Sequence, residues 1–203
     1  MEIAAGIQRK ARIAVCEVNT GLSRSAACAQ LRLVAVEPIQ YATAGNIGKD
    51  LHKIRVDKQV NQLRAKHKAD LVCLVSEAGG GGVAYTGGGK AHGYSVIARH
   101  TIMKSGWTLG HELGHNFGCP HRTGHAFFDG RAGHYTFMSM GPGQSGLLHP
   151  HVKYRGLRQY SNPDVRVQTE FDVIDYFGTP TGTVTNNNAS IIKRNAKRIA
   201  RFY

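Results

Sequence analysis

Residues 111–121, HELGHNFGCPH, combine three histidines and one glutamate at spacings that suit a metal site. His111 and His115 are four residues apart, so on a helix both imidazoles leave the same face, one turn apart. Gly118 can adopt the left-handed conformation that ends a helix, and after that turn His121 can approach the same point. Three neutral imidazoles leave a fourth position open for water, which is typical of a catalytic rather than a structural zinc site.

The remaining positions of this helix divide into two faces. Leu109, Leu113 and Phe117 lie opposite the histidines, so we expect them to be buried against a sheet. Glu112 points between the two faces, near the metal but not towards it, which suits a general base better than a ligand. The alternative is an ordinary surface helix that is rich in histidine, because the short HExxH pattern also arises by coincidence. The added glycine and third histidine argue against that alternative.

The complete pattern HExxHxxGxxH resembles the metzincin metallopeptidases, and within them the bacterial reprolysin-like members. The resemblance continues in YTFMSMG (135–141), where Met138 matches the methionine of the turn that this family places beneath its zinc. QYSNPDV (159–165) is similar to the segment that shapes the pocket for the residue after the cut bond. The chain from residue 178 onward is similar to the C-terminal helix of the family and the approach to it.

The segment GVAYT (82–86) resembles the edge strand on which these peptidases lay an extended substrate. The resemblance therefore implies substrate contacts for four residues: Gly82, Val83, Ala84 and Tyr85. The glycine-rich loop around it does not fit a phosphate-binding loop, because Ala91 stands where that motif needs Ser or Thr.

The resemblance implies a zincin-like α/β (α+β) fold with a twisted mixed sheet, an active-site helix and a small irregular C-terminal lobe that ends in a helix. It implies one catalytic Zn²⁺, and hydrolysis of peptide bonds by a metal-activated water with Glu112 as general base. Expected substrates are proteins or peptides. Relatives are typically secreted, although no signal peptide is recognisable here. Relatives also begin with a strand before the first helix, and we expect this chain to lack it.

Hydrophobic periodicity gives the elements that must position this site. We predict one catalytic domain over residues 1–203, with a sheet lobe to about residue 118 and a smaller lobe after it. The predicted elements are a helix at 4–18, a strand at 31–39, one broken or two short helices at 47–67, strands at 70–76 and 94–98, a helix carrying the motif and a helix near 188–202. A helical segment between two strands favours a sheet with parallel members.

Composition limits the other classes of function. Twenty-six Lys and Arg against thirteen Asp and Glu give a net charge of +13, which favours acidic substrates, anionic surfaces or nucleic acid. No nucleic-acid-binding motif is present, so nucleic acid is a disfavoured partner, and no apolar run is long enough for a membrane span. Two alternatives to the enzyme remain: an inactive zinc-binding module of the same fold, and a basic nucleic-acid-binding protein. The four cysteines show no pairing pattern, and we expect most of them to be buried; the sequence indicates no oligomeric state.

Overall fold

The computed structural model describes residues 2–87, 89–121, 127–128, 132–139, 153–167 and 179–203. Its central element is a three-stranded sheet in the order β1–β3–β2, formed by β1 (Val72–Ser76), β2 (Gly82–Ala84) and β3 (Tyr94–Ala98). β1 runs parallel to β3 and β2 runs antiparallel to it. The predicted mixed sheet with parallel members is therefore confirmed. β3 is buried along its whole length, as expected for the middle strand.

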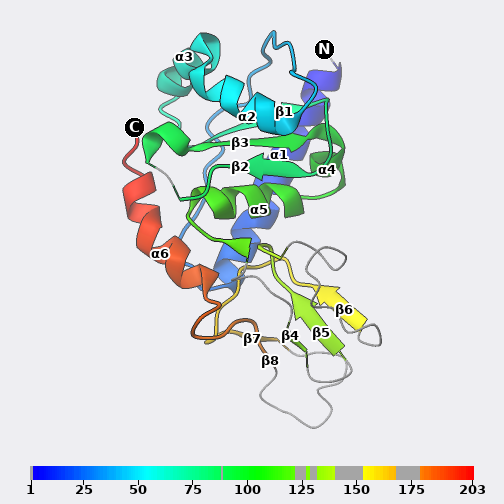
Figure 1. The fold of residues 1–203 in the computed structure, drawn as a ribbon, viewed down its shortest axis with the longest axis vertical. Helices are drawn as coiled ribbons and strands as arrows, with labels where there is room; N and C mark the ends of the chain where they lie inside the picture. The colour runs from blue at the N-terminus through cyan, green and yellow to red at the C-terminus, as the bar shows by residue number, and fades with distance from the viewer. Residues whose placement is uncertain (1, 88, 122–126, 129–131, 140–152, 168–178) are drawn as a thin grey trace.

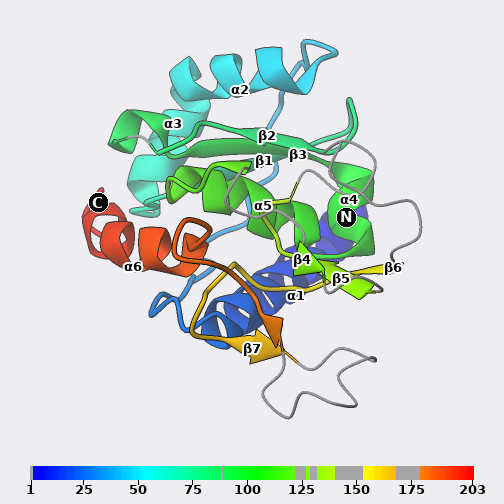
Figure 2. The same ribbon diagram turned by 60° about the horizontal axis from the view of Figure 1, so that its bottom comes forward.

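Helices cover both faces of this sheet (Figure 2). On one face lie α2 (Ile47–Val56) and α3 (Lys58–Lys66), which bury Leu51, Ile54 and Val60 with Tyr94 and Val96 of β3. The other face carries α1 (Glu2–Arg24), α4 (Arg99–Lys104) and α5 (Trp107–Asn116), and their apolar residues form a second core with Ile97. A short helix, η1 (Lys90–His92), precedes β3.

Among the remaining elements, the strands lie on the side of α5 away from the sheet, and the last helix runs from there up to the level of the sheet (Figure 1). They are β4 (Phe127–Phe128), β5 (Ala132–Tyr135), β6 (Lys153–Gly156), β7 (Arg166–Val167), β8 (Thr179–Pro180) and the last helix, α6 (Asn188–Ile199). α6 confirms the helix predicted near 188–202, and it is amphipathic: Ile192 and Ile199 are buried in the core of α1 and α5, and Lys193 and Lys197 are exposed. Among the described residues, no helix is both long and apolar enough to cross a membrane.

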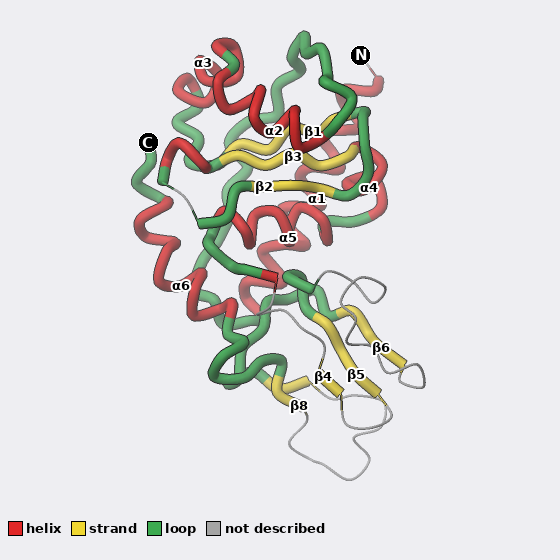
Figure 3. The backbone as a smooth tube through the Cα atoms, in the orientation of Figure 1, coloured by secondary structure: helices red, strands yellow, loops and turns green. Residues whose placement is uncertain are grey.

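Two of the predictions made from the sequence are wrong. Residues 31–39 form no strand, and the whole connection from α1 to α2 is irregular (Figure 3). The segment has the composition of a strand, but among the described strands none lies beside it to complete a ladder. The cysteines also differ from expectation, because Cys16 and Cys28 are exposed and only Cys119 is fully buried.

Candidate metal centre

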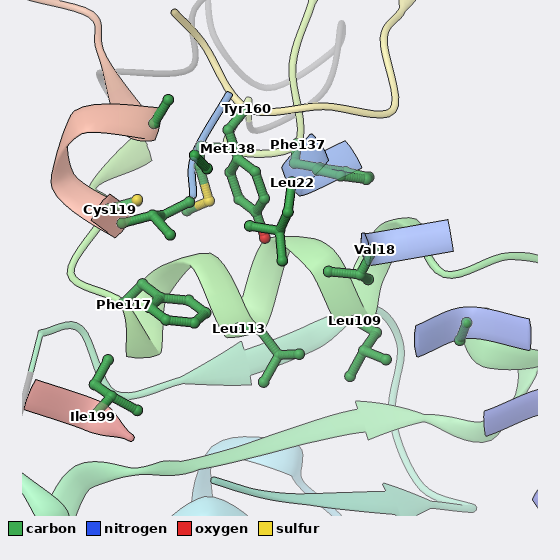
Figure 4. Close-up of a cluster of buried hydrophobic side chains, with 14 of the residues drawn as sticks. Val18, Leu22, Leu109, Leu113, Phe117, Cys119, Phe137, Met138, Tyr160 and Ile199 are labelled. Atoms are coloured by element: carbon green, nitrogen blue, oxygen red, sulfur yellow. The ribbon is translucent and has the colours of Figure 1, made fainter. Parts of the chain in front are cut away.

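Helix α5 carries the histidine motif and is fixed between the sheet and the lower elements. Leu109 and Leu113 point towards the strands, as predicted, and Met138 and Tyr160 lie on the opposite side of the helix (Figure 4). At its start, the backbone N–H of Gly106 donates to the carboxylate of Glu17 on α1 at 2.5 Å. The helix is thus held from three directions before any ligand is considered.

The three predicted ligands converge on one point. Nε2 of His121 lies 3.0 Å from Nε2 of His111 and 2.9 Å from Nε2 of His115. The sharp return of the chain depends on Gly118, whose φ of +99° lies in the region that favours glycine. Gly118 and His121 therefore occupy the relative positions that the sequence predicted.

Backbone carbonyls orient two of the imidazoles. Nδ1 of His111 lies 2.6 Å from the carbonyl oxygen of Phe137, and Nδ1 of His115 lies 2.8 Å from that of Cys119. A carbonyl oxygen can only accept a hydrogen bond, so each Nδ1 must carry the proton and donate it. Each Nε2 then keeps its lone pair, which is the tautomer that a metal ligand requires.

Burial also keeps these rings neutral. Desolvation lowers the pKa of His111 to about 4, against a smaller opposing effect of the hydrogen bond to Phe137. The pKa of His115 is lowered for the same reason. Zinc binds neutral imidazole, so His111 and His115 fit a zinc ion in protonation, and all three side chains fit it in donor type and convergence.

Glu112 is buried beside this cluster, with 4% of its surface exposed. Burial raises the pKa of its carboxyl to about 8 in the protein alone. The carboxylate lies against Gly82 of β2, where a Cβ would be 2.6 Å from Oε1 of Glu112. The absence of a side chain at residue 82 therefore leaves the space that the carboxylate occupies.

Of the four residues implied in substrate binding, Gly82, Val83 and Ala84 form β2, an outer strand of the sheet, and Tyr85 follows it directly. β2 pairs only with β3 among the described strands, so its other edge is available to an extended chain. The side chains of Val83 and Tyr85 pack with those of α2, away from α5. Two features of β2 fit the binding of an extended peptide. Its free backbone edge can form hydrogen bonds, and the small residues Gly82 and Ala84 leave room for the peptide.

Met138 is fully buried, and it packs against α5 at a glycine. A Cβ at Gly114 would overlap Sδ of Met138 and approach the ring of Tyr160 at 3.0 Å. The hydroxyl of Tyr160 donates to the carbonyl of Gly110 at 2.7 Å. Met138 was predicted from its sequence context, whereas Gly110, Gly114 and Tyr160 were not, because their importance depends on packing between distant segments.

Asn116 is a further residue that the sequence analysis missed. Its side chain is buried, and Nδ2 lies 3.0 Å from the carbonyl oxygen of Tyr85 and 3.1 Å from that of Tyr94. Asn116 thereby connects the end of α5 to the residue after β2 and to β3. The residue after Asn116 is bound from α6: the side-chain amide of Asn195 donates to the carbonyl of Phe117 at 2.8 Å.

Comparisons with known proteins agree with this geometry. Residues 8–122 match the family described as "Metallo-peptidase family M12B Reprolysin-like". A "Peptidyl-Asp metalloendopeptidase" of Pseudomonas aeruginosa is 33% identical over 119 residues, a match that covers 51% of this chain and 20% of that protein. A solved structure described as "Structure of a chaperone-substrate complex" aligns with a TM-score of 0.67 over 93% of this chain and 30% of that chain, at 21% identity. At that identity the likeness shows the fold alone.

Proposed function

The chain belongs to the reprolysin-like metallopeptidases, a zinc-dependent family, and from this premise we propose that it is a zinc endopeptidase with the metzincin form of the zincin fold. The observation that carries the proposal is the convergence of Nε2 of His111, His115 and His121 beside the buried carboxylate of Glu112. The substrates of such an enzyme are proteins or peptides.

In this proposal His111, His115 and His121 hold one zinc ion, which supplies a Lewis acid and lowers the pKa of water. The carboxylate of Glu112 accepts a proton from the attacking water and then delivers that proton to the nitrogen of the leaving amine. The carboxylate must be ionised to begin, and a cation bound at the histidines would lower the pKa of Glu112 from its raised value. Met138 packs against Gly114 on the side of α5 opposite the sheet and so supports the helix that carries the ligands.

The substrate is proposed to lie along β2 as an added extended strand. Gly82 and Ala84 offer backbone groups there without a side chain large enough to separate the peptide from α5. Gly82 also lies directly beside Glu112, so a peptide on this strand passes the general base. The roles of Gly82, Val83, Ala84 and Tyr85 depend on this placement.

We propose acidic peptides as the preferred substrates. The net charge of +13 attracts them over long distances. The relative from Pseudomonas aeruginosa carries a name that specifies peptidyl-Asp bonds, although this chain matches only 20% of its length. The sequence of this chain therefore supports a preference for negatively charged peptides, but not a preference for one particular residue.

A peptide library tests the proposal directly. Purified protein loaded with zinc is incubated with a mixed library that includes acidic sequences, with and without a chelator, and the products are identified by mass spectrometry. Cleavage that the chelator abolishes supports the peptidase. The matched control is Glu112→Gln, which keeps the shape of the side chain and is expected to bind zinc without cutting peptides.

Other outcomes support the alternatives. Zinc binding with no cleavage of any library member contradicts the enzyme and favours a zinc-binding module. Binding to DNA that weakens steeply with salt, in the absence of proteolysis, favours a nucleic-acid-binding protein. If Glu112→Gln loses zinc together with activity, the role of Glu112 as general base is wrong.

A further inference from the structure

The ring of Tyr85, the residue after β2, is contacted by basic side chains from two other elements. From α2, Nδ1 of His52 lies 2.9 Å from the hydroxyl of Tyr85, and the guanidinium carbon of Arg55 lies 5.6 Å from the ring centroid. From η1, the ring of His92 meets that of Tyr85 edge-on, with 5.0 Å between the centroids. A contact with a ring stabilises a guanidinium, but it provides no oxygen acceptor for the N–H donors of Arg55.

Arg55 is half-buried and has no anionic partner in the described part of the chain. Its Nε is buried and makes no hydrogen bond to a described residue, and none of the ion pairs found there includes Arg55. The acidic residues of the same layer have other contacts. The carboxylate of Asp50 accepts hydrogen bonds from Thr43 and Ala44, and Asp57 caps the first turn of α3. A buried donor without an acceptor is rare in a folded protein and calls for an explanation.

Arg64 of α3 provides a comparison within the same layer. It also lies on a tyrosine ring, 4.7 Å from the centroid of Tyr94. Its three nitrogens donate to backbone carbonyls at 3.0, 2.5 and 2.8 Å, those of Ala69, Asp70 and Lys90. These bonds give Arg64 a structural role. Arg55 has the same kind of ring contact, but its buried Nε has no such acceptor, so packing alone does not explain an arginine at this position.

The register of the sheet determines which backbone groups of β2 face its open edge. β2 runs antiparallel to β3, and the N–H of Tyr85 donates to the carbonyl of Tyr94 at 3.4 Å. In an antiparallel ladder, residues that bond to the neighbouring strand alternate with residues that do not. Counting back from Tyr85, Ala84 and Gly82 are the residues whose N–H and C=O point away from β3. An extended peptide on this edge therefore pairs with these two residues.

The same register determines where the side chains of such a peptide point. The side chain of Tyr85 packs with the α2 core, whereas a Cβ at Gly82 would meet Glu112 of α5, so β2 has two distinct faces. Residues that lie opposite each other on adjacent strands share a face, with Cβ atoms about 4.5–5.5 Å apart. The peptide residue beside Tyr85 therefore projects towards α2, which packs over β2 and β3 (Figure 2), and so towards Arg55. Its two neighbours project to the α5 face.

We propose that Arg55, held against the ring of Tyr85, is a specificity-determining residue that binds the carboxylate of an Asp or Glu side chain of the substrate. The inference rests on the proposed function, because it requires a peptide to lie along β2. A guanidinium binds a carboxylate through two parallel N–H···O bonds, whereas the amide of Asn has one oxygen and no charge. Arg55 therefore selects an acidic residue at one substrate position, while the net charge of +13 attracts acidic peptides without regard to position.

The first measurement follows binding without cleavage. Zinc-loaded Glu112→Gln protein is titrated with fluorescent extended peptides that differ only in Asp or Asn at one position, and affinity is measured by fluorescence anisotropy. We expect a peptide pair in which Asp binds about tenfold more tightly than Asn. Adding Arg55→Met should remove this difference, and adding Lys49→Met should keep it. Lys49 is exposed on the same helix, so its loss changes the net charge equally. Circular dichroism verifies that both variants remain folded.

The second measurement uses the active enzyme, because the cut bond defines each substrate position. Asp is moved along the peptide one residue at a time, and kcat and KM are compared with those of the matching Asn peptides. Arg55→Met should reduce the ratio of kcat/KM for Asp over Asn about tenfold at one position, mainly through KM, and leave the ratio at the two adjacent positions unchanged. Arg55→Glu should reverse the preference at that position in favour of Lys, because it replaces the cation by an anion.

Three results would overturn the proposal. The first is the absence of any peptide pair in which Asp binds more tightly than Asn, or a difference that Arg55→Met leaves intact. The second is an equal loss in Lys49→Met, which identifies overall charge as the cause. The third is an equal loss at adjacent substrate positions. The two levels of inference fail separately: binding of Asp that depends on Arg55 without cleavage of any peptide contradicts the peptidase alone, and cleavage with a preference that ignores Arg55 contradicts this proposal alone.

Discussion

Nδ1 of His111 donates a hydrogen bond of 2.6 Å to the carbonyl of Phe137, the residue immediately before Met138. The turn that contains Phe137 and Met138 therefore contacts α5 twice. Its backbone orients His111, and the side chain of Met138 packs against the same helix. The two functions are joined because Met138 packs at Gly114, one turn along α5 from His111. The turn is thus part of the candidate metal centre through its contacts with α5.

The packing of Met138 against Gly114 predicts that Gly114→Ala destabilises the protein. A Cβ at this position overlaps Sδ of Met138, which is fully buried and cannot move away freely. We expect a loss of about 1–3 kcal/mol in the free energy of unfolding, measured by urea denaturation, and weaker zinc binding by competition with a chelator. The control is Gly6→Ala in α1, where nothing lies within 4 Å of the new Cβ; there the helix should become slightly more stable. Equal stability of the two variants would contradict the packing argument.

The contact between Gly82 and Glu112 predicts that Gly82→Ala impairs catalysis without removing zinc. The new Cβ would lie 2.6 Å from Oε1 and 2.7 Å from Cγ of Glu112, so the carboxylate must move. We expect kcat to fall by about tenfold or more, with a smaller change in KM and an unchanged zinc content by elemental analysis. Gly80→Ala is the matched control, since its Cβ meets nothing within 4 Å. Full activity of Gly82→Ala would show that Glu112 is not constrained by β2.

The convergence of the three histidines was predictable from sequence because their geometry is local. A spacing of four residues on a helix fixes the relation of His111 to His115, and a glycine that permits a positive φ explains the position of His121. The hydrogen-bond acceptors of these rings were not predictable. Phe137 lies 26 residues from His111, and nothing in its side chain indicates that its carbonyl is the group that matters.

The strand predicted at 31–39 is wrong for a different physical reason. Alternation and branched residues describe a segment that suits a sheet, but a strand also needs a neighbour at its edge. In this structure the described strands provide none beside Leu33 and Val36, although both pack against the core as strand residues would. The local pattern indicates a segment that suits a sheet, but it cannot tell whether a neighbouring strand is there to pair with it.

Thiol reactivity should separate the four cysteines into two pairs. Cys16 and Cys28 are exposed, and burial raises the pKa of the Cys119 thiol and raises that of Cys73 to about 12. Since the thiolate is the reactive form, we expect two thiols to react rapidly with Ellman's reagent in the native protein and all four in denaturant. Peptide mapping after alkylation should identify the rapid pair as Cys16 and Cys28. Rapid modification of Cys119 would contradict its burial in the core.

Asp50 should make the stability of the protein depend on pH in the acidic range. Burial alone would raise the pKa of this carboxyl, but the N–H of Ala44, the hydroxyls of Thr43 and Tyr41 and the ammonium of Lys53 together lower it. A carboxyl whose pKa is lower in the folded state contributes stability above the unfolded value, about 3.9, and loses it as the pH falls through the folded value. We expect Asp50→Asn to cost about 1.5–3 kcal/mol in urea unfolding at pH 7 and progressively less below pH of about 4. Asp164→Asn, at an exposed residue, is the control and should change stability little at either pH. A cost of Asp50→Asn that is the same at both pH values would show that the ionised carboxylate is not what holds residues 41–44 against α2.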